Sequence, residues 1–337
     1  MRTTVKKIVV HLLHYSGLLW LIAAARLRRR IVVLTYHRVL PRRLQDESFS
    51  APGIIVAPDT FNRHMRFISR HLHPIDVSTF ERILTRGEAF RPGTCVVTFD
   101  DGWWDNLEFA LPILERHQVP AVLFVATDYI GSERCFWQER LSRRLFCMRN
   151  EASASALLGQ LGLVGIIGAP AAPARTAIRR FVDELKMGTL DDIRNTFARL
   201  DGVSVDSGGS DVDRFLTWNE LAKLTEGRWF TVASHGATHT PFTRLSREAV
   251  RREVADSFLA LRSRLEVTAN ALAYPNGDVD ADVAANVRDA GVAVGFTTER
   301  GLASGNQNPS LTPRVNMHEA AASDTATFLY RLLGLPQ

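Results

Sequence analysis

Cys95-Val96-Val97-Thr98-Phe99-Asp100-Asp101-Gly102 is the stretch of sequence on which the fold depends. Its apolar, β-branched start predicts a strand that is buried on both faces, as in parallel sheets. Two carboxylates follow directly. One Asp is enough to cap a following helix. Two adjacent carboxylates bring like charges close together, which costs free energy unless a cation lies between them or one of them binds a proton.

Similar short apolar runs recur along the chain, separated by helical patterns. We expect strands at Ile31–Tyr36, Cys95–Phe99, Ala121–Ala126, Trp229–Ala233, Ala271–Tyr274, Val292–Thr297 and, shorter, near Leu311–Val315. We expect helices at Thr60–His71 with Asp59 as its cap, at Trp104–His117, at Ser246–Leu265 and at Asp282–Ala290. This alternation predicts an α/β fold built on a mainly parallel sheet or barrel.

The region Asp128–Thr217 breaks this alternation for 90 residues. Glu151–Ala174 is rich in Ala, Gly and Ser, and Asp201–Asp213 is rich in Gly, Ser and Asp, so both indicate flexible connections. Arg175–Leu200 has a helical pattern between them. An insertion of this length in a compact domain is usually a functional lid or a loose excursion. We expect a helical insert over the mouth of the barrel rather than an independent domain.

The composition of the 337-residue chain is that of an ordinary globular protein, with 46% hydrophobic and 23% charged residues. It excludes a mainly disordered, collagen-like or multi-span membrane protein. Three cysteines without a CxxC motif argue against a disulfide scaffold and against a thiolate metal site. A metal in this protein would therefore be held by His, Asp or Glu.

The positive charge is concentrated at the N-terminus. Residues 1–43 contain ten Lys or Arg and no acid, so the rest of the chain is net −5 although the whole is +5. A nucleic-acid enzyme usually carries its basic face on the folded body, so we expect no nucleic-acid partner. A basic segment before an acidic body indicates an anionic membrane surface.

The N-terminal run Ile8–Ala25 is apolar over 18 residues, slightly short for a bilayer-spanning helix. It has the pattern of a signal peptide, of a signal anchor, of an interfacial helix or of a helix that packs on the protein itself. His11 and His14 form a polar stripe, and the arginine-rich segment 26–30 resists translocation. We favour residues 1–30 as an interfacial helix of a cytoplasmic protein at the inner face of the membrane, with a signal anchor or export as the alternatives.

A second chemically suggestive stretch is Ser234-His235-Gly236-Ala237-Thr238-His239, which again follows a strand. Histidines at i and i+4 on a helical turn can share a metal, although this spacing alone is weak evidence. A helical zinc-protease motif would need Glu at position 236, where this chain has Gly. Two histidines and one Asp make a three-ligand set with open positions, as catalytic zinc requires.

Three more polar groups lie at or near strand ends: His37, Asn276 in the turn Tyr274–Gly277, and Arg314. Taken singly, they are explained by a satisfied histidine, a simple turn and a surface cation. The carboxyl ends of parallel barrel strands gather on one face, where active sites are built. Five groups at such positions therefore predict one site.

The motifs TFDDG (98–102), SHxxTH (234–239), YPNG (274–277) and LTPRV (311–315) resemble those of the polysaccharide deacetylase family, the NodB-homology carbohydrate esterases of family 4. The resemblance covers roughly Ile31 to Asn316, with the insert matching least. It implies a distorted (β/α) barrel of incomplete strand count over residues 31–337. It also implies metal-dependent removal of acetyl groups from sugars.

The resemblance also implies residue roles. Asp101, His235 and His239 match the zinc ligands, and Asp100 matches the catalytic base. The backbone N–H of Asn276 matches an oxyanion donor.

This chain departs from the family at two points. The usual Arg before the turn is absent, because Leu272 and Ala273 occupy that stretch, and we expect Arg314 to replace it. No C-terminal His motif follows, but a permuted branch takes its acid from an early Tyr-His strand, which Tyr36-His37 resembles. His37 is therefore our candidate acid.

These assignments predict a carbohydrate N-deacetylase that acts on a polysaccharide or glycoconjugate, with an acetylated saccharide as substrate and Zn²⁺ as metal. Tyr274 and Trp103 are candidates for substrate contact, and for Trp103 core packing is the alternative. A deformylase or amidohydrolase, and a carbohydrate-binding relative with impaired catalysis, are the competing interpretations.

Overall fold

The computed structural model describes residues 2–203, 211–265 and 269–335. The chain divides into two compact units, each made of separate segments. The first comprises Met1–Arg42, Pro52–Glu133 and Phe215–Gln337, and the second comprises Arg43–Ala51 and Arg134–Arg214. The second unit thus contains most of the expected insert together with residues 43–51, which the sequence did not assign to it. Its expected place over the barrel mouth stays a prediction.

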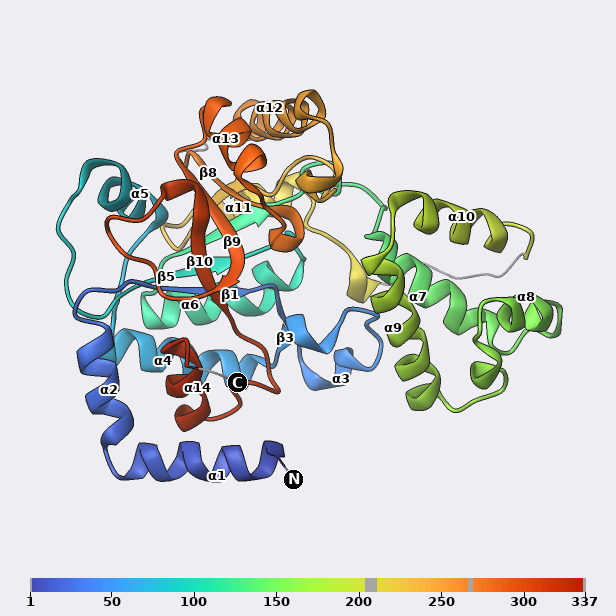
Figure 1. Cartoon of the computed structure of the whole chain (residues 1–337), viewed down its shortest axis with the longest axis horizontal. Helices are drawn as coiled ribbons and strands as arrows, with labels where there is room; N and C mark the ends of the chain where they lie inside the picture. Colours follow the sequence, from blue (N-terminus) through green and yellow to red (C-terminus); the bar gives the residue numbers. More distant parts are fainter. Residues whose placement is uncertain (1, 204–210, 266–268, 336–337) are drawn as a thin grey trace. The chain divides into compact units, whose positions relative to one another are not determined.

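Within the described residues, seven parallel strands of the first unit close into a barrel surrounded by helices (Figure 1). In order around it they are β1 (Val32–Tyr36), β10 (Thr312–Asn316), β9 (Val294–Arg300), β8 (Ala271–Ala273), β7 (Phe230–Ser234), β6 (Ala121–Val125) and β5 (Thr94–Phe99). Strand β5 pairs with β1 to close the ring. The predicted distorted (β/α) barrel is confirmed.

Three short strands were not expected. The strand β4 (His73–Pro74) extends the sheet beside β5, and β2 (Arg38–Val39) pairs with β3 (Ile55–Val56) outside it. With two residues each, they lie below the length at which an apolar period can be recognised.

The barrel strands are apolar because both of their faces are covered. Every residue of β1, β5 and β6 is buried. In β8, Ala271 and Ala273 belong to one core cluster, while Leu272 and the following Tyr274 belong to another with α12 (Arg247–Arg264) and α13 (Ala281–Asp289). Small side chains on one face and large ones on the other follow the period of two of a strand.

Further helices of the first unit are α4 (Pro58–His71), α5 (Val77–Arg86), α6 (Leu111–His117), α11 (Trp218–Thr225) and α14 (Thr325–Leu332); α3 (Arg42–Gln45) spans the boundary between the units. The expected cap of α4 is wrong: Ala57 precedes the helix with Pro58 in its first turn, and Asp59 already lies inside. The expected helix Trp104–His117 is instead a π-helical turn, Asn106–Ala110, followed by α6. Ser246 caps α12 by accepting from the Ala249 N–H at 3.2 Å.

The N-terminal run does not form one helix. It forms α1 (Arg2–Tyr15) and α2 (Leu18–Arg26), which meet at Gly17. Gly17 takes φ of 79°, a left-handed conformation that costs glycine little and ends the first helix. Among the described residues, only the two helices taken together have the length and apolarity of a membrane span, and they are bent by 84°.

The second unit is helical and has its own apolar core. Its helices are α7 (Trp137–Met148), α8 (Ser155–Gln160), α9 (Ala171–Met187) and α10 (Leu190–Leu200). The expected helix Arg175–Leu200 is divided at Gly188, where Thr189 starts α10 with a capping box to Asp192. Residues 204–210 of the expected connection Asp201–Asp213 lie outside the described residues.

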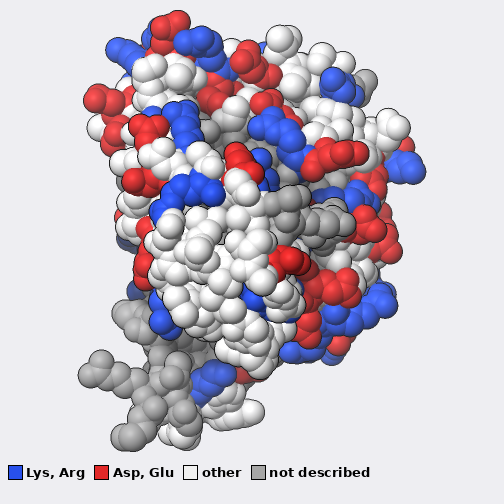
Figure 2. Space-filling view, turned by 90° about the vertical axis from the view of Figure 1, so that its right-hand side faces the viewer, with Lys and Arg blue, Asp and Glu red and all other residues white. Residues whose placement is uncertain are grey.

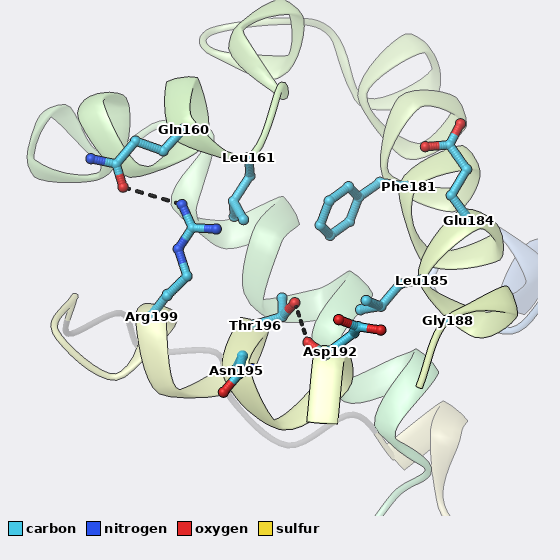
Figure 3. A pocket seen from close by; sticks show the side chains of 10 residues that line it. All are labelled: Gln160, Leu161, Phe181, Glu184, Leu185, Gly188, Asp192, Asn195, Thr196 and Arg199. Atoms are coloured by element: carbon cyan, nitrogen blue, oxygen red, sulfur yellow. Dashed lines mark hydrogen bonds between the residues drawn. The ribbon is translucent and has the colours of Figure 1, made fainter. Parts of the chain in front are cut away.

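The second unit also contains a cavity of about 430 Å³ between α8, α9 and α10 (Figure 3). It is lined by Leu161, Phe181 and Leu185 among polar side chains, and its lining contains neither His nor Cys.

Figure 2 shows one face of the molecule, on which cationic and anionic side chains are interspersed with uncharged ones. Such mixing keeps a surface solvated without a field of one sign.

Candidate active site and metal centre

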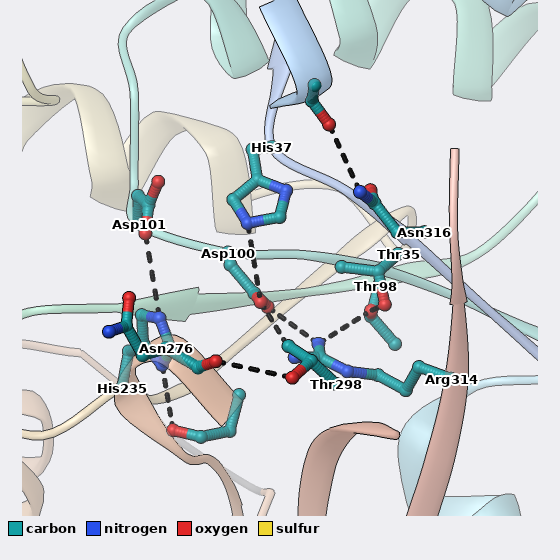
Figure 4. A network of polar contacts seen from close by, with 12 residues as sticks. Thr35, His37, Thr98, Asp100, Asp101, His235, Asn276, Thr298, Arg314 and Asn316 are labelled. Atoms are coloured by element: carbon teal, nitrogen blue, oxygen red, sulfur yellow. Dashed lines mark hydrogen bonds and ion pairs between the residues drawn. The ribbon is translucent and has the colours of Figure 1, made fainter. Parts of the chain in front are cut away.

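Side chains from four barrel strands converge at their carboxyl ends (Figure 4). His37 follows β1, Asp100 and Asp101 follow β5, His235 follows β7, and Arg314 lies within β10. Segments up to 277 residues apart in the chain thus meet in one place, as the strand-end argument predicts.

Asp101, His235 and His239 form a three-ligand group. Their donor atoms all lie within 4.8 Å of one another. The His235 Nε2 lies 3.5 Å from Asp101 Oδ1, and the His239 Nε2 lies 3.4 Å from the same oxygen. Two imidazole nitrogens and one carboxylate oxygen aimed at a common point are a donor set that suits zinc and related divalent ions. The residues therefore fit a catalytic metal with open coordination positions.

Hydrogen bonds set the orientation of His235. Its Nδ1 donates to the Ala273 carbonyl at 2.7 Å, so in the neutral ring Nε2 presents its lone pair to the group. Burial lowers the pKa of His235, but the hydrogen bond and charge of Asp101 raise it above its usual value. A cation in the group would take the place of that proton.

The segment between the two histidines is a loop, not the helical turn that the i, i+4 spacing suggested. Glu253 of α12 holds it: one carboxylate oxygen accepts from the Ala237 N–H at 2.8 Å and the Thr238 N–H at 2.9 Å. The other oxygen accepts from the Thr238 hydroxyl at 2.6 Å. His239 then adopts a left-handed φ of 57° and turns back toward His235, with ring centroids 4.9 Å apart.

Asp101 is oriented by Trp103. The indole N–H donates to Asp101 Oδ2 at 2.8 Å, which leaves Oδ1 facing the histidines. The Trp103 ring is fully buried, stacked on Phe215 with centroids 4.4 Å apart, and the Arg38 guanidinium lies 4.3 Å from its centroid. Trp103 is thus a support for the carboxylate and has no exposed surface for a sugar.

The adjacent carboxylates diverge because Asp101 takes a left-handed φ of 80°. Gly102 follows with φ of 95°, and a Cβ there would approach Ile130 to 2.9 Å, so only glycine fits this turn. Asp100 consequently turns toward Arg314 and His37 (Figure 4).

Asp100 and Arg314 form a buried bidentate ion pair, with both N–H···O distances 2.8 Å. The Arg314 Nε also donates to the Thr297 carbonyl at 2.8 Å, which fixes the guanidinium plane. Burial raises the pKa of Asp100, but Arg314, His235 and His37 together outweigh burial and leave it below its usual value. Asp100 is therefore an ionised, rigidly held acceptor. The structure gives Arg314 the contact expected of the missing family arginine.

His37 completes this edge of the site. Its Nε2 lies 3.8 Å from Asp100 Oδ2, and its Nδ1 is buried without a hydrogen-bond partner among the described residues. The Asn106 amide donates to the His37 carbonyl at 2.8 Å and holds its backbone. Burial lowers the pKa of His37.

The turn after β8 contains one candidate that reaches the site and one that does not. Asn276 takes φ of 63°, and its carbonyl accepts from the Thr298 hydroxyl at 3.2 Å. Its turn begins directly after Ala273, whose carbonyl accepts from His235 Nδ1, and Figure 4 draws Asn276 within this network. Tyr274 is fully buried in the core, where its hydroxyl donates to the Ser310 carbonyl at 2.9 Å. Tyr274 is therefore a core residue with no surface exposed to a substrate.

Sequence reasoning did not identify Glu253 or the support role of Trp103. Glu253 belongs to a charged helix with no distinguishing spacing. Trp103 follows the Asp pair closely, so its position in the sequence was a usable signal, but the direction of its N–H was not.

Comparisons with known proteins agree with this geometry. A family model described as polysaccharide deacetylase matches residues 87–156 and 177–295, more than half of the chain. No curated protein matches the chain in sequence.

Solved structures share the fold at low identity. The Streptococcus pyogenes deacetylase PplD, in complex with acetate, is 17% identical with a TM-score of 0.57, over 87% of this chain and 94% of that one. IcaB from Ammonifex degensii is 15% identical with a TM-score of 0.58, over 89% and 97%. A polysaccharide deacetylase from Bacillus cereus is 16% identical with a TM-score of 0.56, over 90% and 69%.

Proposed function

The chain belongs to the polysaccharide deacetylase family and is a hydrolase of carbon–nitrogen bonds, and we propose that it removes N-acetyl groups from a polysaccharide or glycoconjugate sugar with the help of a zinc ion. One observation carries this proposal. The group Asp101, His235 and His239 lies directly beside an ionised Asp100 that Arg314 holds in place. A protein that only binds sugar has no need of a fixed base next to a metal site.

Asp101, His235 and His239 would hold the metal. When bound, such an ion polarises the acetyl carbonyl and lowers the pKa of a coordinated water. Asp100 is the proton acceptor as water attacks, because Arg314 keeps it ionised and oriented. The backbone N–H of Asn276 donates to the developing oxyanion. His37 as imidazolium gives a proton to the leaving amine. Burial lowers the pKa of His37 below its usual value, and the carboxylates of Asp101 and Asp100 oppose this shift without reversing it.

Metal content per chain is the first test, measured on the wild type, on His235→Ala and on His73→Ala. His73 lies exposed in β4, outside the ligand group, and serves as the matched control. We expect about one zinc per chain in the wild type and the control, and little in His235→Ala. No metal in any of the three, even after zinc is added, would refute the hydrolase mechanism and favour the sugar-binding alternative.

Acyl release then defines the reaction. Release of acetate from an N-acetylated oligosaccharide, without release of formate from its N-formyl counterpart, supports a deacetylase. Release of formate without acetate supports a deformylase.

His37→Ala should lower kcat by about 10²–10⁴-fold without changing metal content. Loss of metal in that variant would make His37 a ligand or a structural residue instead of the acid.

A further inference from the structure

The N-terminal helices expose apolar side chains on their outer surface. Of the twelve large hydrophobic residues exposed in the described chain, eight lie in α1 and α2. They include Val5, Ile8, Val9, Leu12, Tyr15, Leu18 and Leu21, each between 45% and 82% exposed. Positions 5, 8, 9, 12 and 15 have the spacing of one helix face. Concentrations of this kind mark an interaction surface.

The inner surface of the same helices is seated on the barrel unit, so the exposed face does not belong to a detached segment. Val10, Leu19 and Ala23 are buried. The Trp20 ring stacks on Phe67 of α4 with centroids 5.5 Å apart. The His11 Nε2 lies 3.4 Å from the Asp324 carboxylate at the start of α14. Packing on the protein accounts for this inner face, whereas the outer face is open to solvent in the described part of the chain.

A basic cavity adjoins the end of α2. It has a volume of about 700 Å³, and its lining is Ala25, Arg26, Arg28, Arg29, Arg30 and Leu302. All four arginines are exposed. The first 43 residues contain no Asp or Glu, so this segment offers the arginines no internal counterion. The cavity suits anionic groups such as phosphates.

We propose that α1, α2 and the arginine-lined cavity form a docking surface for an anionic phospholipid bilayer. Aliphatic side chains enter the headgroup region, and the arginines contact lipid phosphates. The combination favours a bilayer over nucleic acid, because nucleic acid offers phosphates but no apolar layer. The 84° bend keeps α1 and α2 from forming one straight span, and neither helix alone is long enough to cross a bilayer. Anionic lipid is characteristic of the cytoplasmic leaflet, and a basic flank resists translocation, so the surface belongs at the inner face of the membrane.

Vesicle flotation of the full chain tests this proposal, with phosphatidylcholine alone compared with phosphatidylcholine containing phosphatidylglycerol. The variants are Ile8→Gln/Leu12→Gln for the apolar face and Arg28→Gln/Arg29→Gln for the cavity. Leu259→Gln and Arg252→Gln on α12 are controls with similar exposure, at 67% for Leu259 and 68% for the Arg252 side chain. Circular dichroism verifies that every variant is folded.

We expect the chain to bind the anionic vesicles only. Raised salt should weaken this binding, and each arginine removed should weaken it roughly fivefold. The Ile8→Gln/Leu12→Gln variant should bind about tenfold more weakly, and the controls should bind as the wild type does. Equal binding to both vesicle types, or equal losses in the controls, would overturn the proposal. Release by detergent alone would show a spanning anchor. A dimer in solution that Ile8→Gln/Leu12→Gln dissociates would assign the face to a second copy.

Discussion

The strand-end site and the N-terminal helices both invert the usual rule of burial, in opposite directions. At the site, Asp100, Asp101 and Arg314 are charged and nearly inaccessible. On α1 and α2, apolar side chains such as Ile8 and Leu12 are open to solvent. Buried charges and exposed apolar clusters are the informative departures in a globular protein.

The two regions differ in what offsets the free-energy cost of a buried charge or of an exposed apolar side chain. Asp100 finds its counterion within the chain, and Asp101 receives an indole hydrogen bond and two histidines. Ile8 and Leu12 find no such cover in the described structure. Internal compensation is typical of a preorganised catalytic site, whereas missing compensation indicates a partner outside the chain.

The largest effect on activity is expected at Asp100, a buried charge that is paired within the chain and accepts the proton in the proposed mechanism. Asp100→Asn should lower the rate of acetate release by about 10²–10⁴-fold, because the amide cannot accept the proton of the attacking water. Metal content should stay unchanged, because Asp101, His235 and His239 remain. Enzymatic acetate detection and elemental analysis measure the two quantities. A near-normal rate would remove Asp100 from the mechanism.

Removing the counterion tests the compensation itself. Arg314→Met should lower the free energy of unfolding by about 3–5 kcal/mol, because it leaves the buried Asp100 carboxylate unpaired. Urea unfolding measures this change. Arg252→Met, at an exposed arginine, is the control and should stay within about 0.5 kcal/mol. If the double variant Asp100→Asn/Arg314→Met is no more stable than Arg314→Met alone, the unpaired Asp100 carboxylate is not the cause of the lost stability.

A smaller effect is expected from the support of the metal ligand. Trp103→Phe keeps the ring stack but removes the N–H bonded to Asp101 Oδ2, and should weaken zinc affinity by about 10–100-fold. Competition with a chromophoric chelator measures the affinity. Trp229→Phe, in a half-buried tryptophan outside the ligand group, should leave it unchanged. Unchanged affinity in Trp103→Phe would reduce Trp103 to a packing residue.

The smallest effect is expected on the uncompensated face. Ile8→Gln/Leu12→Gln should change the free energy of unfolding by no more than about 0.5 kcal/mol, because these side chains contact water in the free protein. Leu19→Ala on the inner face should cost about 2–5 kcal/mol, because Leu19 is fully buried. Denaturant unfolding without lipid compares the two. A large loss in the first variant would show that the face packs within the protein.

The amino-acid sequence by itself determined the seven barrel strands and the positions of the polar groups at their ends. Strand periods and the residue after a strand are local properties, so short windows such as Val96–Asp101 and Phe230–His235 were sufficient. The carboxyl ends of parallel strands share one edge, so the strand positions alone predict that Asp101 and His235 lie together.

Only the tertiary structure decided which side chains touch. The partner of Arg314 is 214 residues away in the chain, and the same side chain on a surface would have the same local sequence. The roles of three further residues depend on where their side chains point in the folded protein: Trp103, Glu253 and Tyr274. The bend of 84° lies at Gly17, and α1 and α2 both pack against α14 on either side of it, although the apolar run continues through the bend. Local pattern fixes elements and their ends, whereas contacts across the barrel depend on the closed fold.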